Sequence, residues 1–161
     1  MDPITEPDIR SSFINCSKGA AQRLAVPTDL AGRPWGDLDF LGWSDPGSSG
    51  RCYLVVPEGD HLVGLALRHP TGGPRRAQMC TLCLTTHIGG GVALMAAARA
   101  GAPGRRGDTV GIYTCSDLAC SLYARGKRSP SVGRQYKEDV DPADRAARIR
   151  ERVAAFITRV R

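Results

Sequence analysis

The sequence predicts an α+β fold, in which a small antiparallel sheet and several helices surround an embedded four-cysteine metal module. Three observations support this prediction. Apolar runs at residues 52–56 and 61–68 flank a tight turn, which is typical of a β-hairpin. Apolar residues recur at helical spacing close to the C-terminus. Two close pairs of cysteines bracket residues 84–114 and have the spacing of metal ligands.

Residues 1–78 are expected to form an N-terminal α/β portion. Residues 1–12 predict a mobile start, and Ser17 is a good N-cap for the short helix expected after it. Both tryptophans lie in the stretch 35–43, which we interpret as core rather than as a platform for stacked bases. The hairpin near 52–68 completes this portion.

Residues 79–126 are expected to form the metal module. Three consecutive glycines at 89–91 predict a loop. Residues 92–100 are compatible with a helix or a strand, whereas residues 109–114 favour a strand. We prefer a hairpin of these two segments, because it returns the second cysteine pair towards the first.

Two helices are expected in the remaining chain. Ser116 or Asp117 can cap a short helix that ends before Gly126. Residues 127–161 predict a basic linker and a C-terminal amphipathic helix, which begins at the Asp-Pro pair 141–142. We expect the three portions to form one compact unit. The apolar stripe of the last helix consists of Ile149, Val153, Phe156 and Val160.

The formal net charge of +6 is concentrated in the C-terminal part. Residues 1–98 carry a net charge of −1, whereas residues 99–161 carry +7. A basic surface attracts RNA or an acidic protein face, and a solvated arginine-rich surface is the plain alternative. An apolar fraction of 42% argues against wholesale disorder. No apolar run approaches the ~20 residues that span a bilayer, so no membrane association is expected.

The cysteines indicate a reducing compartment. The N-terminus lacks the pattern of a signal peptide, so we expect a cytoplasmic protein. Six cysteines in such a chain are more often metal ligands or free thiols than disulfides. Cys16 and Cys52 stand alone, and we expect both to be buried as small apolar side chains.

The other four cysteines, Cys80, Cys83, Cys115 and Cys120, have the spacing of a structural zinc site. Two residues separate the first pair, so a tight turn can present both sulfurs to one ion. Four residues separate the second pair, and a strand end followed by a helix accounts for the wider gap. A knuckle, a hairpin and a ligand-bearing helix make a treble-clef zinc finger. Iron on the same thiolates, His87 replacing one cysteine, and four unrelated buried cysteines are the alternatives.

The sequence favours a protein without enzymatic activity or a small-molecule substrate. Four thiolates leave no open position on zinc for a catalytic water. No His-x-Glu motif of a zinc deaminase precedes the cysteine pairs, and neither a nucleophile elbow nor a His-Glu-x-x-His motif is present. The glycines at 89–91 lack the Lys and Ser/Thr of a phosphate-binding loop.

Three segments carry a family resemblance: Met79-Cys80-Thr81-Leu82-Cys83-Leu84-Thr85-Thr86-His87, then Gly89-Gly90-Gly91-Val92, then residues 111–123. They resemble the treble-clef zinc finger of the elongation factor G-binding protein family, which includes the FusB-type fusidic acid resistance proteins. A weaker likeness extends upstream through residues 15–17 and 35–43 to the hairpin, and so covers most of the chain.

The resemblance implies that the four cysteines bind zinc and that the zinc-bearing domain binds elongation factor G. Resistance members release this factor from ribosomes stalled by fusidic acid. They carry a helical bundle before this domain, for which the chain offers little room. Factor binding is therefore a firmer expectation than drug resistance.

Two functional hypotheses follow. The first is a non-enzymatic zinc protein that binds elongation factor G and promotes its release from the ribosome. The second is a zinc module that binds RNA or the ribosome through a basic surface. Phosphate binding weakens steeply with salt, which separates the two. Partner contacts are predicted for His87, Arg99, Arg105, Arg106, Tyr113, Lys127 and Arg128.

Overall fold

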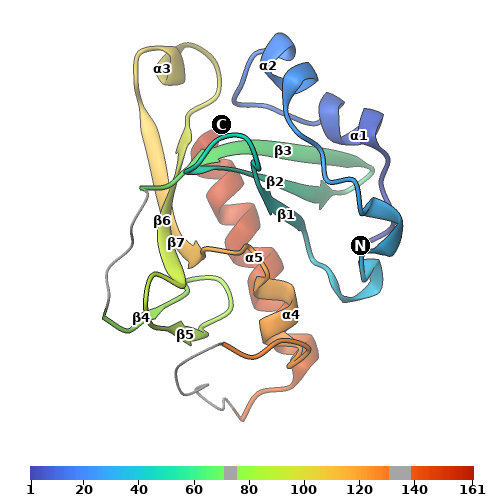
Figure 1. The fold of residues 1–161 in the computed structure, drawn as a ribbon, viewed down its shortest axis with the longest axis vertical. Coiled ribbons are helices and arrows are strands. Elements are labelled where there is room, and N and C mark those ends of the chain that lie inside the picture. Colours follow the sequence, from blue (N-terminus) through green and yellow to red (C-terminus); the bar gives the residue numbers. More distant parts are fainter. Residues whose placement is uncertain (71–75, 131–138) are drawn as a thin grey trace.

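The computed structural model describes residues 1–70, 76–130 and 139–161 (Figure 1). Its helices are α1 (Glu6–Ser11), α2 (Lys18–Arg23), α3 (Gly101–Arg105), α4 (Cys120–Ala124) and α5 (Pro142–Val160), with 3₁₀ helices η1 (Leu30–Gly32) and η2 (Trp35–Asp37). Its strands are β1 (Leu41–Ser44), β2 (Arg51–Glu58), β3 (His61–Arg68), β4 (Gln78–Met79), β5 (Thr86–His87), β6 (Val92–Ala98) and β7 (Thr109–Cys115). The predicted α+β class is confirmed.

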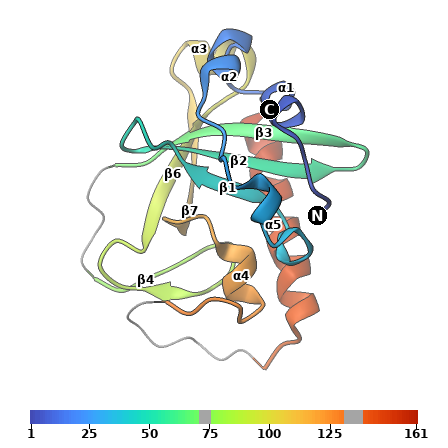
Figure 2. The ribbon, with the colours of Figure 1, turned by 45° about the vertical axis from the view of Figure 1, so that its right-hand side comes forward.

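An antiparallel sheet of five strands runs in the order β1-β2-β3-β6-β7, and β4 and β5 form a separate two-stranded ladder. Strands β3 and β6 pair at only two positions, Leu67 with Ala97 and Arg68 with Ala96. The sheet changes direction there, so that β6 and β7 cross the direction of β1–β3 steeply (Figures 1 and 2). The same sheet thus contains strands from residues 1–78 and from residues 79–126.

The two faces of the sheet are covered by different helices. On one face, α5 lies behind the strands (Figure 1), and its Ile149 and Val153 share a core with Leu54, Leu65 and Met95. The whole predicted stripe of α5 is buried, because its spacing of three and four places all four side chains on the helix face towards the sheet. The other face packs against α1 and α2.

The second core contains the aromatic stretch that we predicted to be buried. Trp35 and Trp43 lie with Leu41 and Tyr53 beneath the N-terminal helices. Each indole N–H donates a hydrogen bond to a backbone carbonyl, which satisfies its polar atom inside the core. The hairpin of β2 and β3, the hairpin of β6 and β7, and the N-cap of α2 at Ser17 also agree with the prediction.

Three expectations were wrong or incomplete. The first residues are ordered, because Thr5 and Asp8 form a capping box on α1 and the Met1 ammonium donates to the carbonyls of Trp35 and Leu38. Residues 101–108 contain the helical turn α3 rather than a plain turn. Cys52 is buried, but Cys16 is only half-buried, because it lies beside an open pocket.

The linker predicted at 127–140 lies partly outside the described residues, which omit 131–138. Within the described ranges, no helix combines the length and apolar character needed to cross a membrane.

Candidate metal centre

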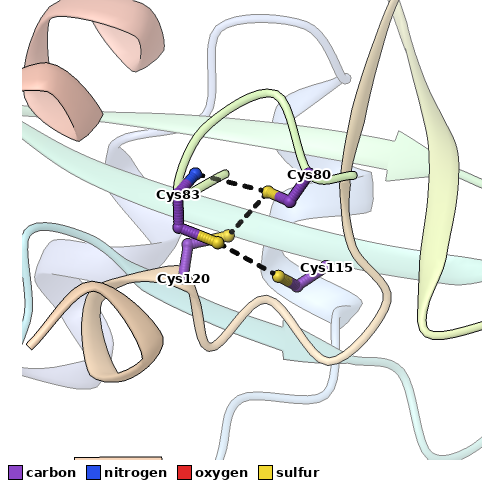
Figure 3. Close-up of side chains that lie close together, drawn as sticks. All are labelled: Cys80, Cys83, Cys115 and Cys120. Atoms are coloured by element: carbon purple, nitrogen blue, oxygen red, sulfur yellow. Dashed lines mark hydrogen bonds between the residues drawn. The ribbon is translucent and has the colours of Figure 1, made fainter. Parts of the chain in front are cut away.

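Four thiol groups meet where the knuckle, β7 and α4 come together (Figure 3). The sulfurs of Cys80, Cys83, Cys115 and Cys120 all lie within 4.8 Å of one another. The Cys80–Cys120 sulfur distance is 3.6 Å, and the Cys83–Cys115 distance is 3.5 Å. Sulfurs placed tetrahedrally at about 2.3 Å from zinc lie ~3.8 Å apart. The cluster therefore has the size of a four-thiolate zinc site.

The first two cysteines are presented by a knuckle between β4 and β5. The Cys80 N–H donates to the Thr85 carbonyl, and the Leu84 N–H donates to the Cys80 carbonyl. The Cys83 N–H points at the Cys80 sulfur, at 3.4 Å. Leu84 has φ +58°, which lets the chain turn back immediately after Cys83. These bonds place both sulfurs on one side of the turn.

The second pair is presented differently from the expectation. Cys115 ends β7 as predicted, but α4 begins at Cys120, and neither Ser116 nor Asp117 caps it. The reason is Leu118, whose φ of +54° reverses the chain before the helix starts. Asp117 stabilises this turn by accepting the Ala119 N–H at 3.1 Å and, with its other oxygen, the Tyr123 hydroxyl.

Polar groups surround the sulfurs inside the protein. The Thr114 hydroxyl lies 3.2 Å from the Cys120 sulfur, and the Thr85 hydroxyl lies 3.3 Å from the Cys83 sulfur. His87 Nε2 lies 3.3 Å from the Cys115 sulfur, with its ring edge-on to Tyr123. Such groups can donate hydrogen bonds to metal-bound thiolates and so hold their orientation.

The protein matrix by itself disfavours ionisation at two of the four thiols, whereas at Cys80 burial opposes ionisation but hydrogen bonds from the other three cysteines outweigh it and lower the pKa. Hydrogen bonding to Cys120 and the other sulfurs, together with burial, raises the pKa of Cys115. Burial raises the pKa of Cys120. Because zinc binds thiolates, its binding displaces protons from these groups, and zinc affinity falls as the pH is lowered.

The donor set is closed. All four cysteines are at most 5% exposed, so a metal held by them would lie inside the protein. A four-coordinate, buried, all-sulfur site is a structural zinc site, in which the ion joins the knuckle to β7 and α4.

The comparison with protein families agrees with this geometry. The model of the FBP C-terminal treble-clef zinc-finger family matches residues 8–160. The chain belongs to this family. Comparisons with curated proteins and with solved structures gave no match. Family membership and the buried cysteine cluster together identify zinc as the cofactor and confirm the predicted treble clef. The match covers β1–β3 as well as the finger, so the likeness does extend over most of the chain.

The residues predicted as partner contacts do not form one surface. Tyr113 is exposed near the zinc end of β7. Arg99, Arg105 and Arg106 are exposed around α3, at the other end of the β6–β7 hairpin (Figure 1). A strand of seven residues spans roughly 23 Å, so the basic tip is far from the metal.

The other three predicted contacts have partners within the protein. His87 is only 6% exposed and lies against Cys115, so its assignment to the interface was wrong: the knuckle turns its ring inwards. Lys127 lies 3.8 Å from Asp37, and Arg128 lies 3.4 Å from Asp117. These two cations extend from the end of α4 and are exposed.

Sequence reasoning missed an apolar groove beside the zinc site. A cavity of about 700 Å³ lies between the knuckle, β7 and α5. We call it the finger groove. Its apolar lining includes Met79, Leu84, Leu94, Ile112 and Tyr113. Arg152 and Arg159 also line it, and we refer to them as the rim arginines. The exposure of Leu94 could not be predicted from the alanine-rich sequence of β6, because only the pairing of β6 with β7 shows that this side chain points away from the core.

Proposed function

We propose that this chain is a non-enzymatic, cytoplasmic zinc protein that binds elongation factor G through its zinc finger and promotes release of the factor from the ribosome. Membership of the FBP family and the resemblance to elongation factor G-binding proteins support this proposal. The structural observation that carries it is the finger groove, which adjoins the zinc ligands.

The finger groove has the character of a protein interface. Met79 is 49% exposed, Leu94 is 40% exposed and Tyr113 is 47% exposed, which is unusual for large apolar side chains grouped together. Tyrosine, methionine and arginine are enriched where proteins bind one another. The two rim arginines favour a partner segment that combines apolar side chains with acidic ones.

In this proposal, zinc holds the knuckle in position against β7 and so shapes the finger groove. The Thr81 N–H donates to the Tyr113 carbonyl at 2.8 Å, so the knuckle held by the metal lies directly against β7. Arg152 donates to the Thr81 carbonyl, and Arg159 donates to the Gly111 carbonyl at 3.1 Å. The walls of the groove are thereby fixed before a partner arrives, which lowers the entropic cost of binding.

Calorimetry with zinc-loaded protein and elongation factor G from the same organism, at physiological salt, tests the proposal. We expect saturable binding near one to one. The double variant Leu94→Ser/Tyr113→Ser should bind about tenfold more weakly or worse, because it removes two apolar anchors. Val140→Ser is the matched control: Val140 is 39% exposed but precedes α5, far along the helix from the groove.

Other outcomes redirect the proposal. Equal affinities of the groove variant and the control would place the interface elsewhere. Absence of binding heat with zinc in place, together with steeply salt-dependent binding to ribosomal RNA, would favour the RNA-binding alternative. The tip of the β6–β7 hairpin, with its exposed Arg99, Arg105 and Arg106, would then be the first surface to vary.

A further inference from the structure

A second pocket lies on the face of the sheet that packs against the N-terminal helices. It has a volume of about 660 Å³ and opens between α2, the start of β2 and the end of β6 that is remote from Cys115. Its lining brings three arginines from three elements to one place: Arg23 of α2, Arg51 of β2 and Arg68 of β3. We call it the arginine pocket.

The charges of the arginine pocket are only partly offset by the described protein: Arg51 interacts with the Tyr53 hydroxyl, which donates to Asp45. Elsewhere arginine side chains pair with carboxylates, as Arg10 does with Glu6 and Arg33 with Asp29. Within residues 1–70, 76–130 and 139–161, no ion pair joins Arg23, Arg51 or Arg68 to a carboxylate. All three residues are exposed.

Two of these arginines are placed where sheet stability disfavours them. Arg51 and Arg68 are directly opposite each other in the β2–β3 ladder, on the same face. Like charges in this position destabilise a sheet. An anion bound between the two guanidinium groups would remove this repulsion.

One acidic side chain belongs to the described lining, and it is already engaged. Asp45 accepts a hydrogen bond from the Tyr53 hydroxyl at 2.7 Å. With three arginines and this aspartate, the lining carries a net charge of +2. A carboxylate ligand would neutralise half of that charge, whereas a phosphomonoester carries about −1.5 to −2 at pH 7. Guanidinium groups also match phosphate oxygens bidentately.

The floor of the pocket suits an organic group attached to the phosphate. Small and apolar residues lie beside the arginines, including Leu24, Ala96 and Ala98. Ala96 is opposite Arg68 on β6, and its lack of a long side chain leaves room next to the charge. A pocket of this volume is in the range that binds cofactors and nucleotides.

Asn15 makes the pocket rigid. Its Nδ2 donates to the carbonyls of Ala66 on β3 and Ala98 on β6, and its Oδ1 accepts the Ala66 N–H at 2.8 Å. This side chain therefore joins β3 to β6 beside their short ladder. Strand β3, which carries Arg68, and strand β6, which carries the alanines of the floor, are therefore held in position relative to each other before a ligand binds.

We infer that the arginine pocket binds a phosphomonoester carried on a nucleoside, either as a free mononucleotide or as the 5′-phosphorylated end of an RNA strand. The phosphate lies between Arg51 and Arg68, with Arg23 closing over it, and the nucleoside lies on the alanine and leucine floor. This site is independent of the finger groove and of the proposed binding of elongation factor G.

The test is a calorimetric titration of the zinc-loaded full chain with adenosine 5′-monophosphate at physiological salt. We expect saturable binding that Arg51→Gln/Arg68→Gln weakens about tenfold or more. The control Arg33→Gln/Arg161→Gln removes the same charge from positions that line neither the arginine pocket nor the finger groove, and should change affinity less than about twofold. Unchanged thermal midpoint and zinc content would show that the pocket variant is folded.

Each further result decides the inference. Much tighter binding of a 5′-phosphorylated oligoribonucleotide than of the mononucleotide, lost in the pocket variant, would identify RNA ends as the source of the phosphate. Equal binding of adenosine, equal weakening by both double variants, or no saturable binding would overturn the site. The pocket variant should bind elongation factor G as the parent does, so failure of one proposal leaves the other intact.

Discussion

The β1–β3 hairpin region and the zinc finger achieve order in different ways. Strands β2 and β3 pair over eight positions, and Val55, Val63 and Leu65 are at most 1% exposed. In the finger, the elements around the knuckle and the last ligand are short: strands β4 and β5 have two residues each and helix α4 has five. Elements this short are not stable by themselves. We therefore expect apolar burial to be sufficient for the first region, and the cysteine-bearing part of the second to depend on zinc.

The two regions are nevertheless joined. Leu54 and Leu65 of the hairpin share one core with Cys80 and Tyr123 of the finger. Asp39, whose side chain is 2% exposed, precedes β1 and pairs with Arg125 after α4 at 2.5 Å and with Arg150 of α5 at 2.9 Å. The strength of this link decides whether loss of zinc unfolds the finger alone or the whole chain.

Loss of the metal should have the largest effect. Cys80→Ser/Cys115→Ser removes two of four ligands, and structural zinc contributes roughly 10 kcal/mol or more to the folding of small fingers. We expect loss of zinc and loss of amide protection over residues 79–124, with protection retained in β2 and β3. Hydrogen exchange with zinc analysis measures both.

Cys16→Ser is the matched control, because this half-buried thiol lies outside the metal cluster and should leave zinc content unchanged. Retention of zinc by the double variant would refute the ligand assignment. Loss of protection in β2 and β3 together with the finger would show that the two regions fold as one cooperative unit.

Asp39→Asn should have the next largest effect. The change leaves the partly buried Arg125 without its carboxylate, and breaking a buried ion pair in this way typically costs about 3 kcal/mol. We expect a lower free energy of unfolding by urea titration, with zinc still bound. A loss below about 0.5 kcal/mol would show that the shared apolar core alone joins the two regions.

The pH dependence of this variant supplies a second check. Burial opposes ionisation of Asp39, but hydrogen bonds from Arg125 and Arg150 and their charges outweigh it and hold the pKa of Asp39 below its usual range. A carboxyl whose pKa is lower in the folded than in the unfolded protein contributes its full stabilisation of the fold above the unfolded-state pKa, which is about 4 for aspartate. This contribution is lost as the pH falls through the folded-state pKa. The stability difference between parent and Asp39→Asn should therefore shrink below about pH 4.

Leu84→Gly should have the smallest effect, and it should be favourable. Leu84 has φ +58°, and the backbone strain of a non-glycine residue in this region is about 1–2 kcal/mol. Glycine relieves this strain, but it loses more chain entropy on folding, which offsets roughly 0.5–1 kcal/mol of the gain. We expect a gain of about 0.5 kcal/mol with zinc bound. Thermal unfolding measures it, and a loss of stability would show that Leu84 contributes more by packing in the finger groove than its backbone strain costs.

Leu118→Gly is the contrasting variant. Leu118 has φ +54°, but it is buried and lies against Gly42 of β1, where even a methyl group on the glycine would meet Leu118 Cβ at 2.5 Å. The lost packing should outweigh the relieved strain, so this variant should be less stable than the parent. Comparing the Leu84→Gly and Leu118→Gly variants separates the contribution of backbone strain to stability from that of side-chain packing.

Local patterns in the sequence were sufficient to predict most helices and strands and the metal ligands. The stripe of α5, the β2–β3 hairpin and the cap at Ser17 depend on neighbouring residues, and so they were predictable. The start of α4 was not, because Leu118 in a left-handed conformation gives no compositional sign. Nor was the order at the N-terminus, since the Met1 ammonium finds its acceptors some 34 and 37 residues away.

The sequence by itself determined the cysteine spacing, hence the zinc site, and the alternation of apolar residues, hence the strands and the last helix. The tertiary structure alone decided which exposed side chains act together. It placed Met79, Leu94 and Tyr113 around one groove, turned His87 towards a sulfur, and gathered Arg23, Arg51 and Arg68 at one pocket. The physical reason is that the spacing of metal ligands and the periodicity of apolar residues are local properties of a chain. A surface, in contrast, is formed by elements that come together only when the sheet changes direction and the helices pack on it.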